Sequence, residues 1–103
     1  MEEAQRFAAL GNELRLAVFR LVIASGDRGL PAGQIAAQLD VPASTLSSHL
    51  KTMQQVGLLN SRREQQKLIY TVNHEVVREL IGFLVRDCCQ SQPDLCGLTI
   101  KDR

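Results

Sequence analysis

Apolar residues recur at helical spacing through the first half of the chain. The clearest stripe follows Asn12, which is a good N-cap residue, and Ser25 and Gly26 end this helix because Gly can adopt the left-handed closing conformation. A shorter helix is predicted before Asn12. The inward positions are Ala4, Phe7, Ala8 and Leu10 in the short helix, and Leu14, Ala17, Val18, Leu21 and Val22 in the longer one.

Two more helices follow, separated by a tight connection. Residues 27–31, DRGLP, are predicted to form a loop, and Pro31 suits the first turn of the next helix. The connection runs from Asp40 to Pro42, and Gly57 lies just past the end of the second helix. The apolar positions are Ile35, Ala36 and Leu39 in the first helix, and Leu46, Leu50 and Met53 in the second.

The period then changes to that of strands. Residues 58–63, LLNSRR, and 67–72, KLIYTV, predict a hairpin whose connection EQQ lacks the Gly that the tightest turns prefer. Leu68, Tyr70 and Val72 share one face of the second strand.

The last predicted helix begins after Asn73, a good cap, and runs to about Cys89. Its broad apolar stripe is typical of a partner-binding element at a chain end, so we expect dimerisation, although packing on the chain's own core is the alternative. The stripe consists of Val77, Leu80, Ile81, Leu84, Val85 and Cys88, widened by Val76 and Phe83.

The order of these elements predicts a mainly α fold with a small β-hairpin, a winged helix-turn-helix. In such a fold the second helix of the pair enters the major groove of DNA with polar side chains outward, and wing cations reach the backbone or the minor groove. The alternatives are that the hydroxyls only cap the helix, that the hairpin is a solvated edge and that His49 only orients its neighbours. The candidate DNA-binding residues are Ser44, Thr45, Ser47, Ser48, His49, Lys51, Arg62, Arg63 and Lys67.

Charge and length sharpen this reading. The net charge is only +1, but no acidic residue lies between Asp40 and Glu64, as a phosphate-facing surface requires. The 103 residues predict one DNA-binding and dimerisation domain, residues 1–90, and a tail, residues 91–103. The acidic start without an apolar signal region, and the absence of a membrane-spanning run, lead us to expect a cytoplasmic protein.

The segments LGNELRLAVFRLV and PASTLSSHLKTMQQVGLLNSRREQQKLIYTV resemble the bacterial ArsR/SmtB repressors over about residues 4 to 90. The resemblance implies a homodimeric repressor that binds an inverted-repeat operator and leaves it when a metal or metalloid ion arrives. It also implies a dimer interface built from the first and last helices. The residues that match this interface are Phe7, Val77, Leu80, Ile81, Leu84 and Val85.

Two ion sites of that family have no counterpart in this chain. Pro31, Ala32 and Gly33 stand where the family's Cys-Val-Cys arsenic motif would lie. The last helix offers Asn73, His74 and Glu75 near its start and no second His downstream, so the family's zinc pattern is missing. The wing also has REQQK where the family frequently has Gly after its Arg.

All three cysteines fall within nine residues, at positions 88, 89 and 96. A disulfide between Cys88 and Cys89 would be strained, because adjacent α-carbons are about 3.8 Å apart and disulfides usually need about 4.4 to 6.8 Å. A turn at Pro93 and Asp94 would return Cys96 to the pair. Three soft sulfur donors favour a thiophilic ion, and a cysteine pair with a third cysteine resembles one of the family's alternative arsenic sites, so we expect trivalent arsenic or antimony as inducer.

Other readings of the thiols remain open. A redox or persulfide switch between Cys89 and Cys96 is the main rival, and other soft metals are possible ligands. Structural zinc normally needs four ligands, and Cys88 alone would be a small buried hydrophobe. An enzyme is not expected, because neither CQSQPDL nor CGLTIKD has the Arg that would close an anion-binding loop, and no catalytic cofactor is implied. A winged helix-turn-helix protein that only binds other proteins is the third class of function, beside a DNA-binding repressor and an enzyme.

Overall fold

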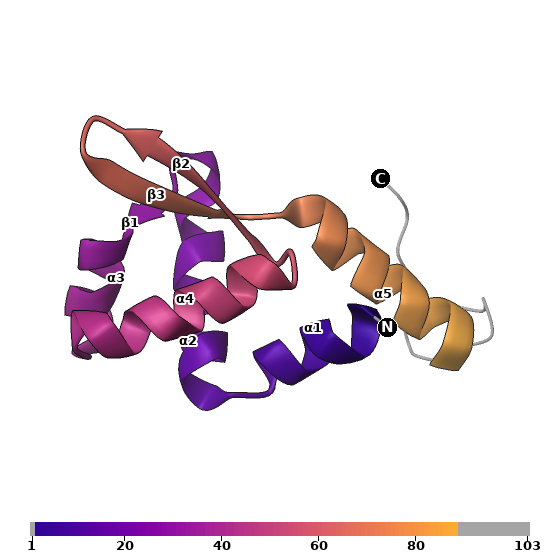
Figure 1. The fold of residues 1–103 in the computed structure, drawn as a ribbon. Helices are drawn as coiled ribbons and strands as arrows, with labels where there is room; N and C mark the ends of the chain where they lie inside the picture. The colour runs from indigo at the N-terminus through magenta and orange to yellow at the C-terminus, as the bar shows by residue number, and fades with distance from the viewer. Residues whose placement is uncertain (1, 89–103) are drawn as a thin grey trace. The chain divides into compact units, whose positions relative to one another are not determined.

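The computed structural model describes residues 2–88, which form five α-helices, a short 3-10 helix and a three-stranded sheet (Figure 1). The chain divides into two compact units, one ending at Asn73 and the other beginning at His74. The first unit holds the four N-terminal α-helices and the whole sheet, and the second contains the last helix. The described residues thus agree with a mainly α chain carrying a small β-hairpin.

Helix α2, Glu13–Ser25, forms as its sequence predicts. The Asn12 side-chain oxygen accepts hydrogen bonds from the backbone N–H groups of Leu14 and Arg15, both at 3.0 Å, which satisfies two donors of the first turn. At the other end Gly26 has a φ of 64°. The stripe faces the core, since Val18 and Val22 are fully buried.

Helix α1, Glu2–Leu10, is present, but the prediction of which side of the helix packs inward was wrong, because the helix is rotated about its axis relative to the predicted orientation. Ala4 and Ala8 are exposed, and Ala9 is buried instead. The reason is a hydrogen bond of 2.8 Å from Arg6 Nε to the backbone oxygen of Val56. This bond turns the face that carries Arg6 and Ala9 toward the end of α4.

The predicted loop at residues 27–31 was partly wrong. A 3-10 turn, η1 (Gly26–Arg28), is followed by a short strand, β1 (Leu30–Pro31), and helix α3 (Ala32–Leu39) begins only after Pro31. The strand pairs antiparallel with the centre of the sheet. Proline is tolerated there because β1 is an edge strand.

Helix α4, Ala43–Gln55, follows a tight turn in which Asp40 is left-handed at a φ of 56°. Its predicted seam is confirmed, because Leu46, Leu50 and Met53 are buried together. Ile35 of α3 is also fully buried, so the helix-turn-helix pair shares the core with α2.

The predicted hairpin is confirmed as β2, Leu59–Glu64, and β3, Lys67–Val72. The antiparallel sheet has the order β1-β3-β2, so β3 is central. Leu68 is 39% exposed because it lies beside the hairpin end, whereas Ile69 on the opposite face is buried. Leu68, Tyr70 and Val72 share one face of β3, as predicted, but only Tyr70 and Val72 are buried there.

Helix α5, His74–Cys88, begins directly after Asn73, as expected. Its predicted end at about Cys89 lies outside the described residues, as do Cys96 and the tail of residues 91–103. No helix in the described part of the chain is long and apolar enough to cross a bilayer.

Candidate nucleic-acid interface

The outward face of α4 is polar and carries no acidic residue. Leu46, Leu50 and Met53 recur at spacings of four and three, which commits one side of the helix to the core and turns the other to solvent. The predicted DNA-binding positions on this helix gather on its solvent side. The exposed ones are Ser44, Thr45, Ser47, Ser48 and Lys51.

The hydroxyls at the start of α4 are not caps. The N-cap residue is Pro42, which has no capping side chain, so Ser44 and Thr45 lie inside the first turn. Their hydroxyls make no hydrogen bond within the described chain. Ser48 differs, because its Oγ donates to the Thr45 carbonyl at 3.2 Å. Ser44 and Thr45 are thus open to an outside partner, and the capping alternative does not apply to them.

His49 is held from the protein side. Its Nδ1 lies 3.1 Å from Nη1 of Arg15, and Arg15 Nε donates to the Ala9 carbonyl at 2.7 Å. Arg15 thereby joins α1, α2 and α4. Sequence reasoning missed Arg15, because it lies 34 residues from His49 and no short motif links them.

The wing places its three candidate cations on two opposite faces. Neighbouring strand residues alternate between faces, and cross-strand partners share one. Arg63 lies opposite Leu68, on the face that also carries Ser61. Arg62 and Lys67 lie on the other face. The three cations therefore do not form one patch.

The face with Arg63 is the one turned toward α4. A hydrogen bond of 2.8 Å from Gln54 Nε2 to Ser61 Oγ joins the end of α4 to β2. Arg63 and Lys67 are exposed and make no hydrogen bond or ion pair with the rest of the described chain. Arg63 thus combines a free charge with the side of the wing that faces α4.

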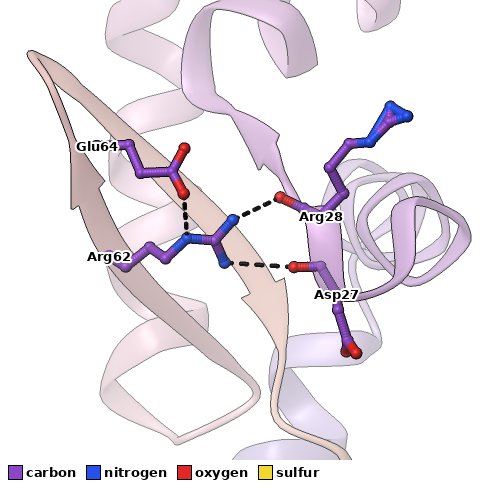
Figure 2. A network of polar contacts seen from close by, with 4 residues as sticks. All are labelled: Asp27, Arg28, Arg62 and Glu64. Atoms are coloured by element: carbon purple, nitrogen blue, oxygen red, sulfur yellow. Dashed lines mark hydrogen bonds and ion pairs between the residues drawn. The ribbon is translucent and has the colours of Figure 1, made fainter.

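Arg62 is engaged within the protein, as Figure 2 shows. Its Nη2 donates to the Arg28 carbonyl at 2.8 Å and its Nη1 to the Asp27 carbonyl at 3.3 Å, while Nε pairs with Glu64 at 2.9 Å. The side chain crosses the central strand from β2 to η1, because β3 lies between β2 and β1. Arg62 therefore positions the wing, a role that the residue pattern did not indicate.

The other predicted sites are only partly described. Cys88 is the last residue of α5, and Cys89 and Cys96 lie outside the described residues. Within residues 2–88 no cluster of His, Cys, Asp or Glu is arranged to hold a metal ion. Among the predicted dimer residues, Ile81 and Leu84 are 50% and 47% exposed, and Leu80 is buried. Phe7, Val77 and Val85 are intermediate.

Comparison with known proteins agrees with this geometry. A family model described as a helix-turn-helix domain matches residues 10–62. The transcriptional activator HlyU of Vibrio cholerae is 34% identical over 83 residues, which are 81% of this chain and 74% of HlyU. The transcriptional regulator YgaV of Escherichia coli is 31% identical over 85% of this chain and 87% of its own length.

Solved structures share the fold over most of the chain. Reduced HlyU from Vibrio cholerae superposes with a TM-score of 0.67 at 30% identity, covering 82% of this chain and 86% of HlyU. An ArsR-like regulator from Rhodococcus sp. RHA1 superposes with a TM-score of 0.78 at 23% identity, covering 92% and 87%. The chain therefore belongs to the helix-turn-helix transcriptional regulators, with the winged fold of their ArsR/SmtB-like members.

Proposed function

We propose that this chain is a homodimeric repressor that leaves its operator when trivalent arsenic or antimony binds Cys88, Cys89 and Cys96. The observation that carries the ligand proposal is the clustering of every thiol within nine residues, beginning at the last residue of α5. The DNA-binding part rests on the free hydroxyls and Lys51 of α4 and on Arg63 of the wing.

The exposed apolar side of α5 supports the homodimer. Ile81 and Leu84 lie one turn apart and are each about half exposed, although isoleucine and leucine are usually buried. A solved relative from Mycobacterium bovis with 24% identity is described as a homodimeric winged helix-turn-helix domain. Two copies of α4 in a two-fold dimer would fit an inverted repeat with half-sites one helical turn apart.

The donor set fits a soft ion. Three thiolates without a nearby His select a thiophilic ion over a hard one, and trivalent arsenic binds three sulfurs in a pyramid. Closing the tail onto the end of α5 would change the packing of the dimer helix and so the spacing of the two recognition helices. A coupling of about 1–3 kcal/mol lowers DNA affinity roughly 5- to 150-fold.

A thiol-based redox or persulfide sensor is the second candidate. The observation that favours it is that HlyU, a relative of 30% identity, has been solved in a reduced form. Here an oxidant would take two electrons and two protons from the Cys89 and Cys96 thiols to form a disulfide. A persulfide donor would instead transfer a sulfur to one thiol, and the other thiolate would displace it as sulfide, which leaves the same disulfide; Cys88 would not take part.

The test is release from DNA measured by fluorescence anisotropy. The DNA would be a tight-binding fragment selected from a random pool, and the reduced protein would be titrated with arsenite. We expect wild type to release the DNA at near-stoichiometric arsenite and Cys88→Ser, Cys89→Ser to stay bound.

Cys88→Ser alone separates the two candidates. It removes one of three arsenic ligands, so arsenite would no longer release it, whereas oxidation or a persulfide donor would still act through Cys89 and Cys96. Release of wild type by oxidant but not by arsenite would reject the metalloid proposal. If binding of the protein raised transcription from the promoter that it occupies, only the proposed role as a repressor would be rejected, because the relative HlyU is named as an activator.

A further inference from the structure

Arg15 is placed where a single side chain connects the scaffold to the candidate recognition helix. Its Nε donates to the Ala9 carbonyl of α1 at 2.7 Å, and its Nη1 contacts His49 Nδ1 of α4 at 3.1 Å. With two bonds in different directions the guanidinium is fixed before any partner arrives. A fixed guanidinium in turn fixes the plane of the His49 ring.

The contact also decides which ring nitrogen carries hydrogen. A guanidinium has only N–H donors and no acceptor, so Nδ1 of His49 must accept. The hydrogen of the neutral ring then lies on Nε2. Within the described residues, Nε2 of His49 has no hydrogen-bond partner. Every buried side-chain nitrogen or oxygen in that part of the chain has a partner, so Nε2 is not buried and reaches solvent.

We propose that Arg15 is a positioning residue for DNA recognition, which presents His49 Nε2–H as a dedicated donor to an acceptor atom of DNA. The inference rests on the DNA-binding function proposed above. His49 lies one helical turn after Thr45, whose hydroxyl is exposed, and is itself partly exposed, so its donor is at the edge of the polar side of α4. The acceptor is an oxygen or nitrogen of DNA, either the N7 or O6 edge of guanine or a phosphate oxygen.

Without Arg15 the ring would lose both constraints. A neutral imidazole exchanges between two tautomers and turns about its side-chain bonds, so it presents a donor in some molecules and an acceptor in others. Because Arg15 already orders the His49 ring in the free protein, DNA does not have to order the ring when it binds. We therefore expect its loss to weaken specific binding without changing the fold.

The direct test is nitrogen NMR of the free protein. The chain has only two histidines, so a His74→Asn variant assigns the His49 signals. In a long-range proton–nitrogen spectrum of the neutral ring, we expect Nδ1 to be bare and Nε2 to carry hydrogen. Arg15→Lys, which keeps the charge but lacks the fork, should show a mixture. A bare Nε2 in wild type would overturn the proposal, whether or not the chain binds DNA.

A double-mutant cycle on the selected DNA fragment tests the consequence. We expect Arg15→Lys to weaken binding roughly 5- to 10-fold, and to have almost no further effect in a His49→Ala background. Arg20→Lys is the matched control, because Arg20 is exposed on the same helix and bonds to nothing in the described chain. An undiminished effect of Arg15→Lys in the His49→Ala background would overturn the proposal.

The cycle also identifies the acceptor. If His49 contacts a base, His49→Ala relaxes the preference at one position of the site, and if it contacts a phosphate, all sequences weaken alike. Failure of wild type to bind any selected DNA would reject the proposed function, and the NMR result would still decide the geometry of Arg15 and His49.

Discussion

Helix α4 and the wing are both candidates for contact with DNA, but different forces hold them in place. Three buried side chains, Leu46, Leu50 and Met53, anchor α4. Most of the polar side chains of α4 are therefore not needed for packing and are available to bind a partner. The wing is buried only at its base, where Leu59, Ile69, Tyr70 and Val72 lie in the core, and its exposed outer part is held by polar and backbone contacts.

The difference affects which residues are free to act. On α4 one side packs and the other side is available, so an exposed polar residue is a good candidate. A charged residue on the wing can either bind the protein itself or contact DNA. Arg62 donates hydrogen bonds to the backbone of η1, whereas Arg63 makes no such bond in the described chain. Charge alone therefore overestimates the contribution of a wing to DNA binding.

The largest effect is expected at the base of the wing, where Gly29 meets the central strand. Its φ is 74°, and an added Cβ would lie 2.6 Å from the Tyr70 carbonyl and 2.7 Å from Ile69 Cγ2. Gly29→Ala adds a left-handed strain of about 1–2 kcal/mol and overpacking of about 1–3 kcal/mol. We expect the free energy of unfolding to fall by about 2–5 kcal/mol in urea denaturation.

Gly33→Ala is the matched control for this prediction. Gly33 lies in α3, its added Cβ would meet nothing within 4 Å, and alanine favours a helix by roughly 0.5–1 kcal/mol over glycine. We expect it to be neutral or stabilising. Equal losses at the two glycines would mean that the close backbone fit does not secure the wing.

Separate substitutions of the neighbouring residues Arg62 and Arg63 would sharpen the comparison between holding the wing in place and contacting DNA. Arg62→Ala removes the bonds to Asp27 and Arg28, so we expect unfolding stability to fall by about 1 kcal/mol. The side chain is 43% exposed, so the ion pair with Glu64 adds little. Arg63→Ala should leave stability unchanged, weaken DNA binding and lower the salt slope of log K by about one.

Two measurements on each variant, thermal unfolding and DNA affinity at several salt concentrations, decide the outcome. Lys67→Ala serves as a control of the same charge change on the opposite face from Arg63. If Arg62→Ala left stability intact and reduced the salt slope as Arg63→Ala does, the distinction between a positioning and a contacting arginine would be wrong.

The residues explain how far sequence could go. Helices α2 and α4 follow from local signals, a capping Asn12 and a buried stripe at helical spacing, so their bounds and cores were predictable. Strand β1 was missed because two residues have no period of their own, and only pairing with β3 makes them a strand. The bond between Arg15 and His49 was missed for the same reason, since it depends on how two distant helices pack.

The smallest effect is expected at the hairpin tip, where Gln65 adopts a φ of 58°. A residue with a Cβ is strained in this region, and the chain has no glycine in the turn to relieve it. Gln65→Gly should raise the free energy of unfolding by about 0.5–1 kcal/mol, because the relief exceeds the added chain entropy. Gln66→Gly is the control, since Gln66 does not share the positive φ, and it should be neutral or destabilising. Chemical denaturation of both variants, with DNA affinity alongside, would show whether the tip only closes the wing. Unchanged affinity with raised stability supports that role, whereas lost affinity in Gln65→Gly would place the tip itself in the DNA contact.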